Sequence, residues 1–317
     1  MKAGRIFGGL VVLVVGVVAS AVTPRAAAVT PAHNGCEWQA EPLPLPMNAA
    51  DGKVTAGAGE WLAGAVSGEG PRQAVRWREG HPDPLGPAFG LDTAVHAINA
   101  DGVIAGTVTG PDQRLHAIRH RGGYERLPET GGHSTALDIN TRGDIVGHDG
   151  ARIVVWTGDH VRPLPLPTGE APYGNAAIDD DGTVMASAGQ VTNGKLQWHT
   201  YRWSPDGTRT PLPAGDVHDL HNGQAVGATP GDAPQAVTWR GDAMLGGRAA
   251  TAMNADAVAG TGIDGTPHIW TKALPEPLPT PPEHHPGEVT ALNTHEAGGF
   301  AYPDNADGAV PVRWRCH

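Results

Sequence analysis

The sequence predicts an all-β protein: a seven-bladed β-propeller with four short antiparallel strands per blade and a ring closed between the N- and C-terminal strands. Three observations support this fold. An apolar segment ending in tryptophan recurs along the chain, tight-turn motifs separate alternating apolar residues, and proline-rich tails close the repeats.

The tryptophan segments set the period of the repeat. Successive anchors are 39, 43, 36, 47, 36, 31 and 44 residues apart, which gives seven repeats of about 39 residues. Periods in this range are typical of solenoids and propellers. The anchors, with a histidine in one tryptophan position, are Trp38, Trp77, His120, Trp156, Trp203, Trp239, Trp270 and Trp314.

The spacing within each repeat indicates strands. Val75 and Trp77, like Val154 and Trp156, are two residues apart, so each pair points to one face of a strand. No window forms a convincing amphipathic helix of ten residues. Segments such as AINADGVIAG (97–106) carry the Asn-x-Asp-Gly chemistry of tight hairpin turns.

The proline-rich tails, such as EPLPLP (41–46) and EPLPTP (276–281), predict the outermost strand of each repeat. Proline has no N–H to donate to a β-ladder, so proline-bearing strands belong at sheet edges. Four such strands repeated seven times describe a propeller. A β-solenoid or an array of sandwiches is the alternative.

The N-terminus predicts export. Residues 1–28 combine basic Lys2 and Arg5, an apolar run over 6–22 and small residues at 26–28, which is the layout of a secretory signal peptide. An uncleaved membrane anchor is the alternative. We therefore expect a short segment at 29–35, a single propeller domain over 36–317, and a secreted monomer with no membrane contact after cleavage.

The charge of the chain argues against nucleic-acid partners. The whole chain carries −11, and the mature chain −14, because residues 1–28 hold three basic residues and no acid. Nucleic acids and anionic lipids both require dense positive charge on a binding protein.

Several segments resemble a known family. HAIRH (116–120), QAVRW (73–77) and QAVTW (235–239), placed between an A-x-I-N-x-x-G-x-(I/V)-x-G turn and a Leu-Pro tail, resemble the HAF-type extracellular repeat proteins of bacteria. In that family a His-Ala-Phe triplet precedes a tryptophan, whereas this chain keeps His-Ala only at His116 and Ala117. The resemblance covers nearly all of residues 36–317. It implies an exported, propeller-like repeat protein and transfers no activity.

A set of polar side chains lies just upstream of the first strand of successive repeats. In a propeller these segments would meet at one mouth of the central channel, where imidazole, phenol and guanidinium groups could hold a ligand. Ordinary polar loops are the alternative. The candidate ligand-binding residues are His96, His133, Tyr173, His218, Arg248 and His285.

Other candidate chemistry finds little support in the sequence. DDDG (179–182) echoes a calcium loop but has no closing glutamate, so we interpret it as a plain turn. HDLH (218–221) has the spacing of half a zinc site without further ligands. No serine lies in a G-x-S-x-G elbow. We predict no catalytic residue, metal or cofactor.

The two cysteines, Cys36 and Cys316, lie near opposite ends of the mature chain. The N-terminal segment matches the last part of a repeat, and the C-terminal repeat lacks that part, so pairing would bring the cysteines together. Exported proteins retain disulfides, and we predict one here. A lipid anchor at Cys36 is the alternative.

These observations favour a secreted, non-enzymatic scaffold that binds an extracellular protein, a glycan or a cell-wall component. An extracellular lyase or hydrolase with a histidine-lined site at the channel mouth is one alternative. A structural protein of the cell envelope is another.

Overall fold

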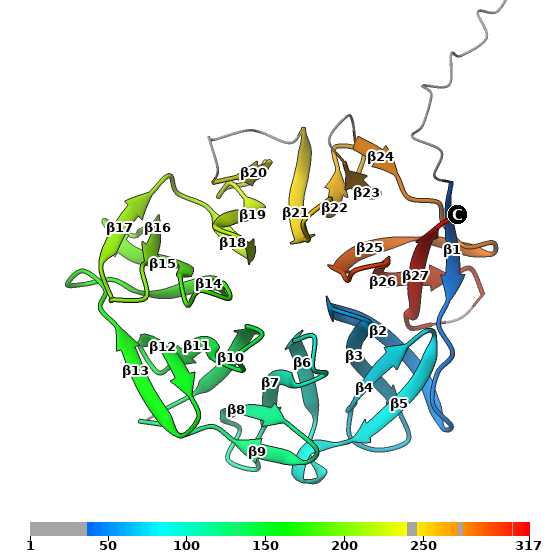
Figure 1. The fold of residues 1–317 in the computed structure, drawn as a ribbon, viewed down its shortest axis with the longest axis horizontal. Coiled ribbons are helices and arrows are strands. Elements are labelled where there is room, and N and C mark those ends of the chain that lie inside the picture. The colour runs from blue at the N-terminus through cyan, green and yellow to red at the C-terminus, as the bar shows by residue number, and fades with distance from the viewer. Residues whose placement is uncertain (1–36, 131, 240–245, 272–274, 306) are drawn as a thin grey trace, which may run out of the picture. The chain divides into compact units, whose positions relative to one another are not determined.

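The computed structural model describes residues 37–317 except 131, 240–245, 272–274 and 306. This part of the chain forms seven antiparallel sheets arranged around a ring, so the prediction of a seven-bladed propeller is confirmed (Figure 1). Within each blade the chain starts with the innermost strand and moves outward. Residues Cys36–His317 form one compact unit.

The first four blades each have four described strands. They comprise β2 (Ala49–Ala58), β3 (Trp61–Gly68), β4 (Gln73–Arg78) and β5 (His81–Gly86) in blade 1; β6 (Thr93–Ile98), β7 (Ile104–Thr109), β8 (Leu115–His120) and β9 (Tyr124–Arg126) in blade 2; β10 (Ser134–Ile139), β11 (Ile145–Asp149), β12 (Arg152–Thr157) and β13 (His160–Leu164) in blade 3; and β14 (Ala171–Ile178), β15 (Val184–Thr192), β16 (Lys195–Trp203) and β17 (Arg209–Leu212) in blade 4. Among the described residues one 3-10 turn is present, η1 (Ala88–Gly90), and it lies between blades 1 and 2.

Blade 5 has three strands among the described residues, and blades 6 and 7 have four. They comprise β18 (Asp216–His221), β19 (Gln224–Ala228) and β20 (Ala236–Thr238) in blade 5; β21 (Gly247–Met253), β22 (Val258–Gly262), β23 (Pro267–Trp270) and β24 (Pro275–Pro277) in blade 6; and β25 (His284–Leu292), β26 (Glu296–Pro303), β27 (Val310–Cys316) and β1 (Trp38–Pro42) in blade 7.

The two ends of the propeller close the ring within blade 7. β1 pairs antiparallel with β27, with Trp38 opposite Cys316 and Pro42 opposite Val312. The N-terminal segment therefore supplies the outermost strand of the last blade, as predicted. Cys36 lies outside the described residues, so the disulfide stays a prediction.

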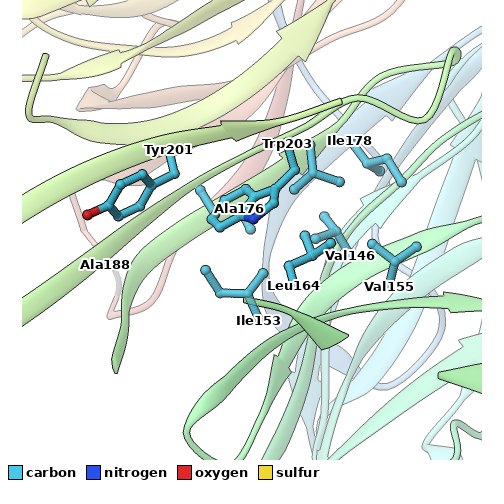
Figure 2. Close-up of a cluster of buried hydrophobic side chains, with 11 residues drawn as sticks. Val146, Ile153, Val155, Leu164, Ala176, Ile178, Ala188, Tyr201 and Trp203 are labelled. Carbon is cyan, nitrogen blue, oxygen red and sulfur yellow. The ribbon is translucent and has the colours of Figure 1, made fainter. Parts of the chain in front are cut away.

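The repeated tryptophans fill the seams between neighbouring blades. Trp156 of blade 3 is 1% exposed and packs with Leu127, which follows the outermost strand of blade 2. Its indole N–H donates to the carbonyl of Pro128 at 2.8 Å. Figure 2 shows the next seam, where Leu164 of blade 3 lies in one cluster with Trp203 of blade 4.

The same contact recurs around the ring and revises the interpretation of the Leu-Pro tails. Trp77 donates to Pro44 at 2.9 Å, and Trp314 donates to Pro279 at 2.7 Å. Each described outermost strand ends within one residue of the tail leucine instead of running through the whole tail. In these seams the leucine and proline join one blade to the next, because the leucine side chain is buried and the proline carbonyl accepts the indole N–H. Trp203 differs, because its buried indole N–H has no partner among the described residues and the Pro165 carbonyl accepts from Arg209 at 2.9 Å.

The seam between blades 1 and 2 is built differently, because His120 takes the tryptophan position in blade 2. His120 is buried and stacks edge-on against Tyr124 with ring centroids 4.7 Å apart. The Tyr124 hydroxyl donates to the carbonyl of Gly86 at 2.8 Å. Gly86 follows the tail leucine of blade 1, so the tyrosine makes the bond that an indole makes in other blades.

Candidate functional site

The two ends of the propeller differ in chemistry. We call the end where the innermost strands begin the entry end, and the end where they finish in a tight turn the turn end. Four of the predicted ligand-binding residues lie at the entry end, at or next to the start of an innermost strand: His133, Tyr173, Arg248 and His285.

All four of these side chains are exposed, and they have different neighbours. His133 accepts the backbone N–H of Leu115 through Nδ1 at 3.1 Å. Tyr173 packs edge-on against Trp198, with ring centroids 4.5 Å apart, and His285 lies 3.3 Å from a carboxylate oxygen of Asp304. The entry end thus presents them as separate groups. Among the described residues no set of three or more His, Cys, Asp or Glu side chains is arranged to hold a metal.

The other two predicted residues, His96 and His218, lie inside innermost strands at a β-bulge. His218 donates through Nδ1 to the Ala250 carbonyl of the next blade at 2.8 Å. Burial opposes protonation of His218, but the hydrogen bond and charge of Asp216 outweigh it and raise the pKa. Burial lowers the pKa of His96 to about 4, so this imidazole is neutral at pH 7.

The bulge position joins blades elsewhere in the ring too. The hydroxyls of Thr55, Thr251 and Thr290 occupy it in blades 1, 6 and 7, and each donates to a backbone carbonyl of the following blade. His218 makes the same kind of bond, so its position serves the architecture. The sequence pattern could not reveal this, because the bulge changes where the side chain points.

Exposed apolar side chains gather at the entry end. In the part of the chain that the structure describes, eight large hydrophobic residues are exposed, and all eight lie at this end. Three lie at or before the start of an innermost strand, and five lie at hairpins between the second and third strands. They are Met47, Phe89, Leu115, Tyr173, Val191, Leu196, Ile263 and Tyr302.

Blade 4 carries the most prominent part of this surface. Its second and third strands, β15 and β16, have nine residues each, against five or six in blades 2 and 3. Tyr173, Leu196 and Trp198 meet over Gly189, where a Cβ would lie 2.8 Å from Leu196 and 3.3 Å from Tyr173. Glycine is therefore needed to seat these apolar side chains on the sheet.

The turn end holds a cavity of about 320 Å³ that is lined by residues from all seven blades. Six aliphatic side chains, one from each of blades 2 to 7, line it, and Gly57 takes this position in blade 1. The aliphatic residues are Ile98, Ile139, Ile178, Leu220, Met253 and Leu292.

The asparagines of the turn motif surround this cavity and bind the blades together. Asn140 accepts the backbone N–H groups of Arg142 and Asp144 through Oδ1, which stabilises its own turn. Its Nδ2 donates to the carbonyl of Asp179 in the next blade at 3.1 Å. Asn99 makes the same contacts, and Asn254 repeats the inter-blade bond.

The acidic turn DDDG is built in the same way. Asp179 accepts the backbone N–H groups of Asn222 and Gly223 in blade 5, so it takes the joining role of an asparagine. Asp180 accepts the N–H of Thr141, and Asp181 caps its own turn. These carboxylates are used by backbone donors, which favours the plain-turn interpretation over calcium.

Two half-buried carboxylates, Asp138 and Asp219, also line the cavity. Each accepts two backbone N–H groups: Asp138 from Ile139 and from Ile178 of blade 4, and Asp219 from Leu220 and from Met253 of blade 6. Burial raises the pKa of Asp138 to about 7, and the charge of Asp219 adds to the effect. Burial also raises the pKa of Asp219.

The sequence analysis missed these two aspartates, although the repeat contains a signal for them. The residue after the bulge is alanine in the other five blades, at positions 56, 97, 177, 252 and 291. A carboxylate that replaces alanine on a buried strand needs a reason, because burial of a charge is costly.

A histidine and a glutamate that could act as a general base lie in contact between blades 3 and 4. His199 contacts Glu170 Oε1 through Nδ1 at 2.7 Å, and the Tyr201 hydroxyl donates to the same oxygen at 2.9 Å. The Glu170 side chain is 5% exposed, and the His199 side chain is 35% exposed. A carboxylate that orients an accessible imidazole is an arrangement found in general-base catalysis.

No protein-family model and no curated protein matches this chain. Solved structures with the same fold do match. The β-propeller domain of the Trilobed protease from Pyrococcus furiosus has 11% identity and a TM-score of 0.60, over 84% of this chain and 95% of that one. That propeller is described as having an open velcro topology, whereas β1 closes the ring here.

Two further structures are similar at lower TM-scores. YCF48 from Cyanidioschyzon merolae has 12% identity and a TM-score of 0.50, over 87% of this chain and 98% of that one. The BP39L lectin from Burkholderia pseudomallei has 14% identity and a TM-score of 0.50, over 88% and 95% of the two chains. At these identities the likeness establishes the class, a β-propeller, and nothing about ligands.

Among the described residues no helix is long and apolar enough to cross a membrane.

Proposed function

We propose that this chain is an exported binding protein whose entry end docks a macromolecular ligand, either an extracellular protein or a glycan of the cell surface. The observation that carries the proposal is the placement of all eight exposed large hydrophobic side chains at that end. Scattered exposed apolar residues are normal on a protein surface, but their concentration on one face marks an interaction surface.

The composition of this surface supports a binding role. Tyr173 is 43% exposed and is held edge-on by Trp198, so a rigid aromatic ring faces solvent. Such rings are enriched where proteins bind partners. The net charge of −11 disfavours polyanions, which directs the proposal to neutral or basic ligands. The lectin among the structural neighbours is a propeller protein named for glycan binding.

Export rests on the sequence, because residues 1–28 lie outside the described residues. The apolar run and the small residues after it have the layout of a cleavable signal. Intact mass of the protein secreted by a bacterial host tests this part. A chain that starts near residue 29 is expected, and a full-length chain retained in the membrane would contradict cleavage of the signal and favour the membrane anchor.

A binding panel tests the docking function. The purified propeller is incubated with insoluble glucan, chitin, peptidoglycan and a set of purified extracellular proteins, and the bound fraction is measured by sedimentation or biolayer interferometry. We compare the wild type with an entry-end variant, Tyr173→Ser with Val191→Ser and Ile263→Ser. The matched control replaces three exposed turn-end residues, Asp101→Ser, Asp159→Ser and Asp206→Ser.

The expected result is at least one ligand bound by the wild type and by the control, with affinity reduced at least about tenfold in the entry-end variant, equivalent to about 1.4 kcal/mol. Equal binding by all three proteins would exclude the entry end as the docking surface. No binding by the wild type to any member of the panel would count against the binding function and favour a structural role.

The enzyme alternative is supported by one observation, the contact between Glu170 and His199. Glu170 would orient the imidazole, and the exposed edge of the ring would accept a proton from a substrate. Polysaccharide and ester hydrolysis or elimination is assayed with the wild type and with His199→Gln. Activity that is lost in the variant would favour a lyase or hydrolase, and absence of turnover in the wild type would reject it.

A further inference from the structure

We propose that the cavity at the turn end is a second binding site, independent of the entry end, and that it takes a small organic cation with an apolar body. The juxtaposition of a ring of aliphatic side chains with two half-buried carboxylates carries the proposal. One part of the cavity recognises the apolar body, and the other recognises the positive charge.

The aliphatic ring defines the apolar part. Ile98, Ile178 and Leu292 are each 4–5% exposed, so each side chain is packed between blades and only a small part of it faces the cavity. Gly57 interrupts it in blade 1 and leaves that side without an aliphatic side chain. A cavity of about 320 Å³ is at the lower end of the range for small-molecule sites.

The ionisable residues that line the cavity are almost all acidic. The lining contains five carboxylates, one histidine and, among the described residues, neither lysine nor arginine. These ionisable lining residues are Asp138, Asp179, Asp180, Asp219, Asp256 and His221. The cavity therefore has a negative potential, and its walls have a low dielectric constant, which strengthens attraction to a cation.

Asp138 and Asp219 place part of that charge at half-buried positions beside the aliphatic ring. Their four backbone N–H bonds hold the carboxylates in fixed orientations. Burial and the nearby charge of Asp219 favour the neutral form of Asp138 and raise its pKa to about 7. A buried carboxylate without a cationic partner is costly, and a bound cation would relieve that cost.

The arrangement favours an organic cation over a metal ion. A metal needs several oxygen ligands converging on one point, and the described residues contain no such group of acidic or histidine side chains. The two half-buried carboxylates instead come from blades 3 and 5, with aliphatic side chains beside them. An alkylammonium ion can contact both kinds of surface at once.

A pair of matched probes separates charge from shape. Cyclohexylamine, protonated at pH 7.5, and cyclohexanol have similar size, and only the first carries a charge. Their binding to the purified propeller is measured by isothermal titration calorimetry and by the change in melting temperature. We expect the amine to bind at least about tenfold more tightly than the alcohol.

Variants assign the effect to the cavity. Asp219→Asn removes one of these two charges and is expected to weaken amine binding at least about fivefold while leaving alcohol binding unchanged. Asp101→Asn removes one charge from an equivalent turn outside the cavity lining, and it should leave amine binding unchanged. If Asp219→Asn fails to fold, the comparison of amine with alcohol on the wild type still decides.

Three results would overturn the proposal. They are equal affinity for amine and alcohol, the same loss of amine binding in both variants, and stabilisation by calcium chloride with none by the amine. None of these results bears on the entry end, so this proposal and the docking function fail or succeed separately.

Discussion

Replacement of Trp156 by alanine tests how the blades are held together. The side chain is 1% exposed, packs with Leu127 of blade 2 and Ile145 of its own blade, and donates its indole N–H to Pro128 at 2.8 Å. Removal of a buried tryptophan from a core costs about 3–5 kcal/mol. The Pro128 carbonyl also loses its donor, and because this site is half-buried the lost hydrogen bond adds about 0.5–1.5 kcal/mol.

Equilibrium urea denaturation measures this loss. Trp156→Phe keeps most of the apolar contact and removes only the donor, so it should cost about 1–2 kcal/mol. Val191→Ala, at a side chain that is 70% exposed, is the matched control and should change the unfolding free energy by less than about 0.5 kcal/mol. A loss below about 0.5 kcal/mol for Trp156→Ala would refute the account of the seams.

Four further predictions concern other contacts of the ring. Asn140→Ala removes four side-chain hydrogen bonds, one of them long at 3.4 Å, and should lower the unfolding free energy by about 2–3 kcal/mol in the same assay, and an unchanged value would contradict the joining role of the turn. Tyr124→Phe removes the hydrogen bond to Gly86 and should lower the unfolding free energy by about 1 kcal/mol in the same assay. An unchanged value would argue against the proposal that the Tyr124 hydroxyl replaces the indole N–H in this seam. Burial lowers the pKa of His148 to about 4, below its value of 6.5 in the unfolded chain, so the unfolding free energy falls as the pH drops from 6.5 to 4. In a pH series, His148→Gln should remove up to about 3 kcal/mol of this loss of stability. Identical pH profiles for the wild type and the variant would contradict the role of His148. Non-reducing intact mass of the secreted protein should be two hydrogens below the reduced form because Cys36 and Cys316 are bonded, whereas two free thiols or a lipid on Cys36 would exclude the closure by a disulfide.

The repeat made the fold predictable, because the same physical requirement occurs seven times. Strand alternation, turn chemistry and the tryptophan period all point to one architecture, and the sequence ends contain complementary parts of one blade. The role of the Leu-Pro tails was only partly predicted. Their position at the outer edge of each blade follows from proline chemistry. The acceptor role of the carbonyl depends on which residue of the next blade lies opposite.

The candidate sites were harder to predict for a different reason. A bulge before the turn sets the side-chain direction of His96 and His218, and spacing in the sequence does not reveal bulges. The exposed apolar residues share no motif, with three in blade 4 and, among the described residues, none in blades 3 and 5, so only the three-dimensional ring brings them to one end. Asp138 and Asp219 are recognised only when the seven repeats are aligned at the bulge, because the equivalent residue is alanine in the other five blades.

Carbene footprinting of the propeller, bound to the ligand that the panel identifies, tests the docking function most directly. The account predicts reduced labelling of entry-end residues, above all Tyr173, Val191 and Ile263, with unchanged labelling of turn-end residues such as Asp101. Protection confined to the turn end, or none at the entry end in a saturated complex, would contradict it.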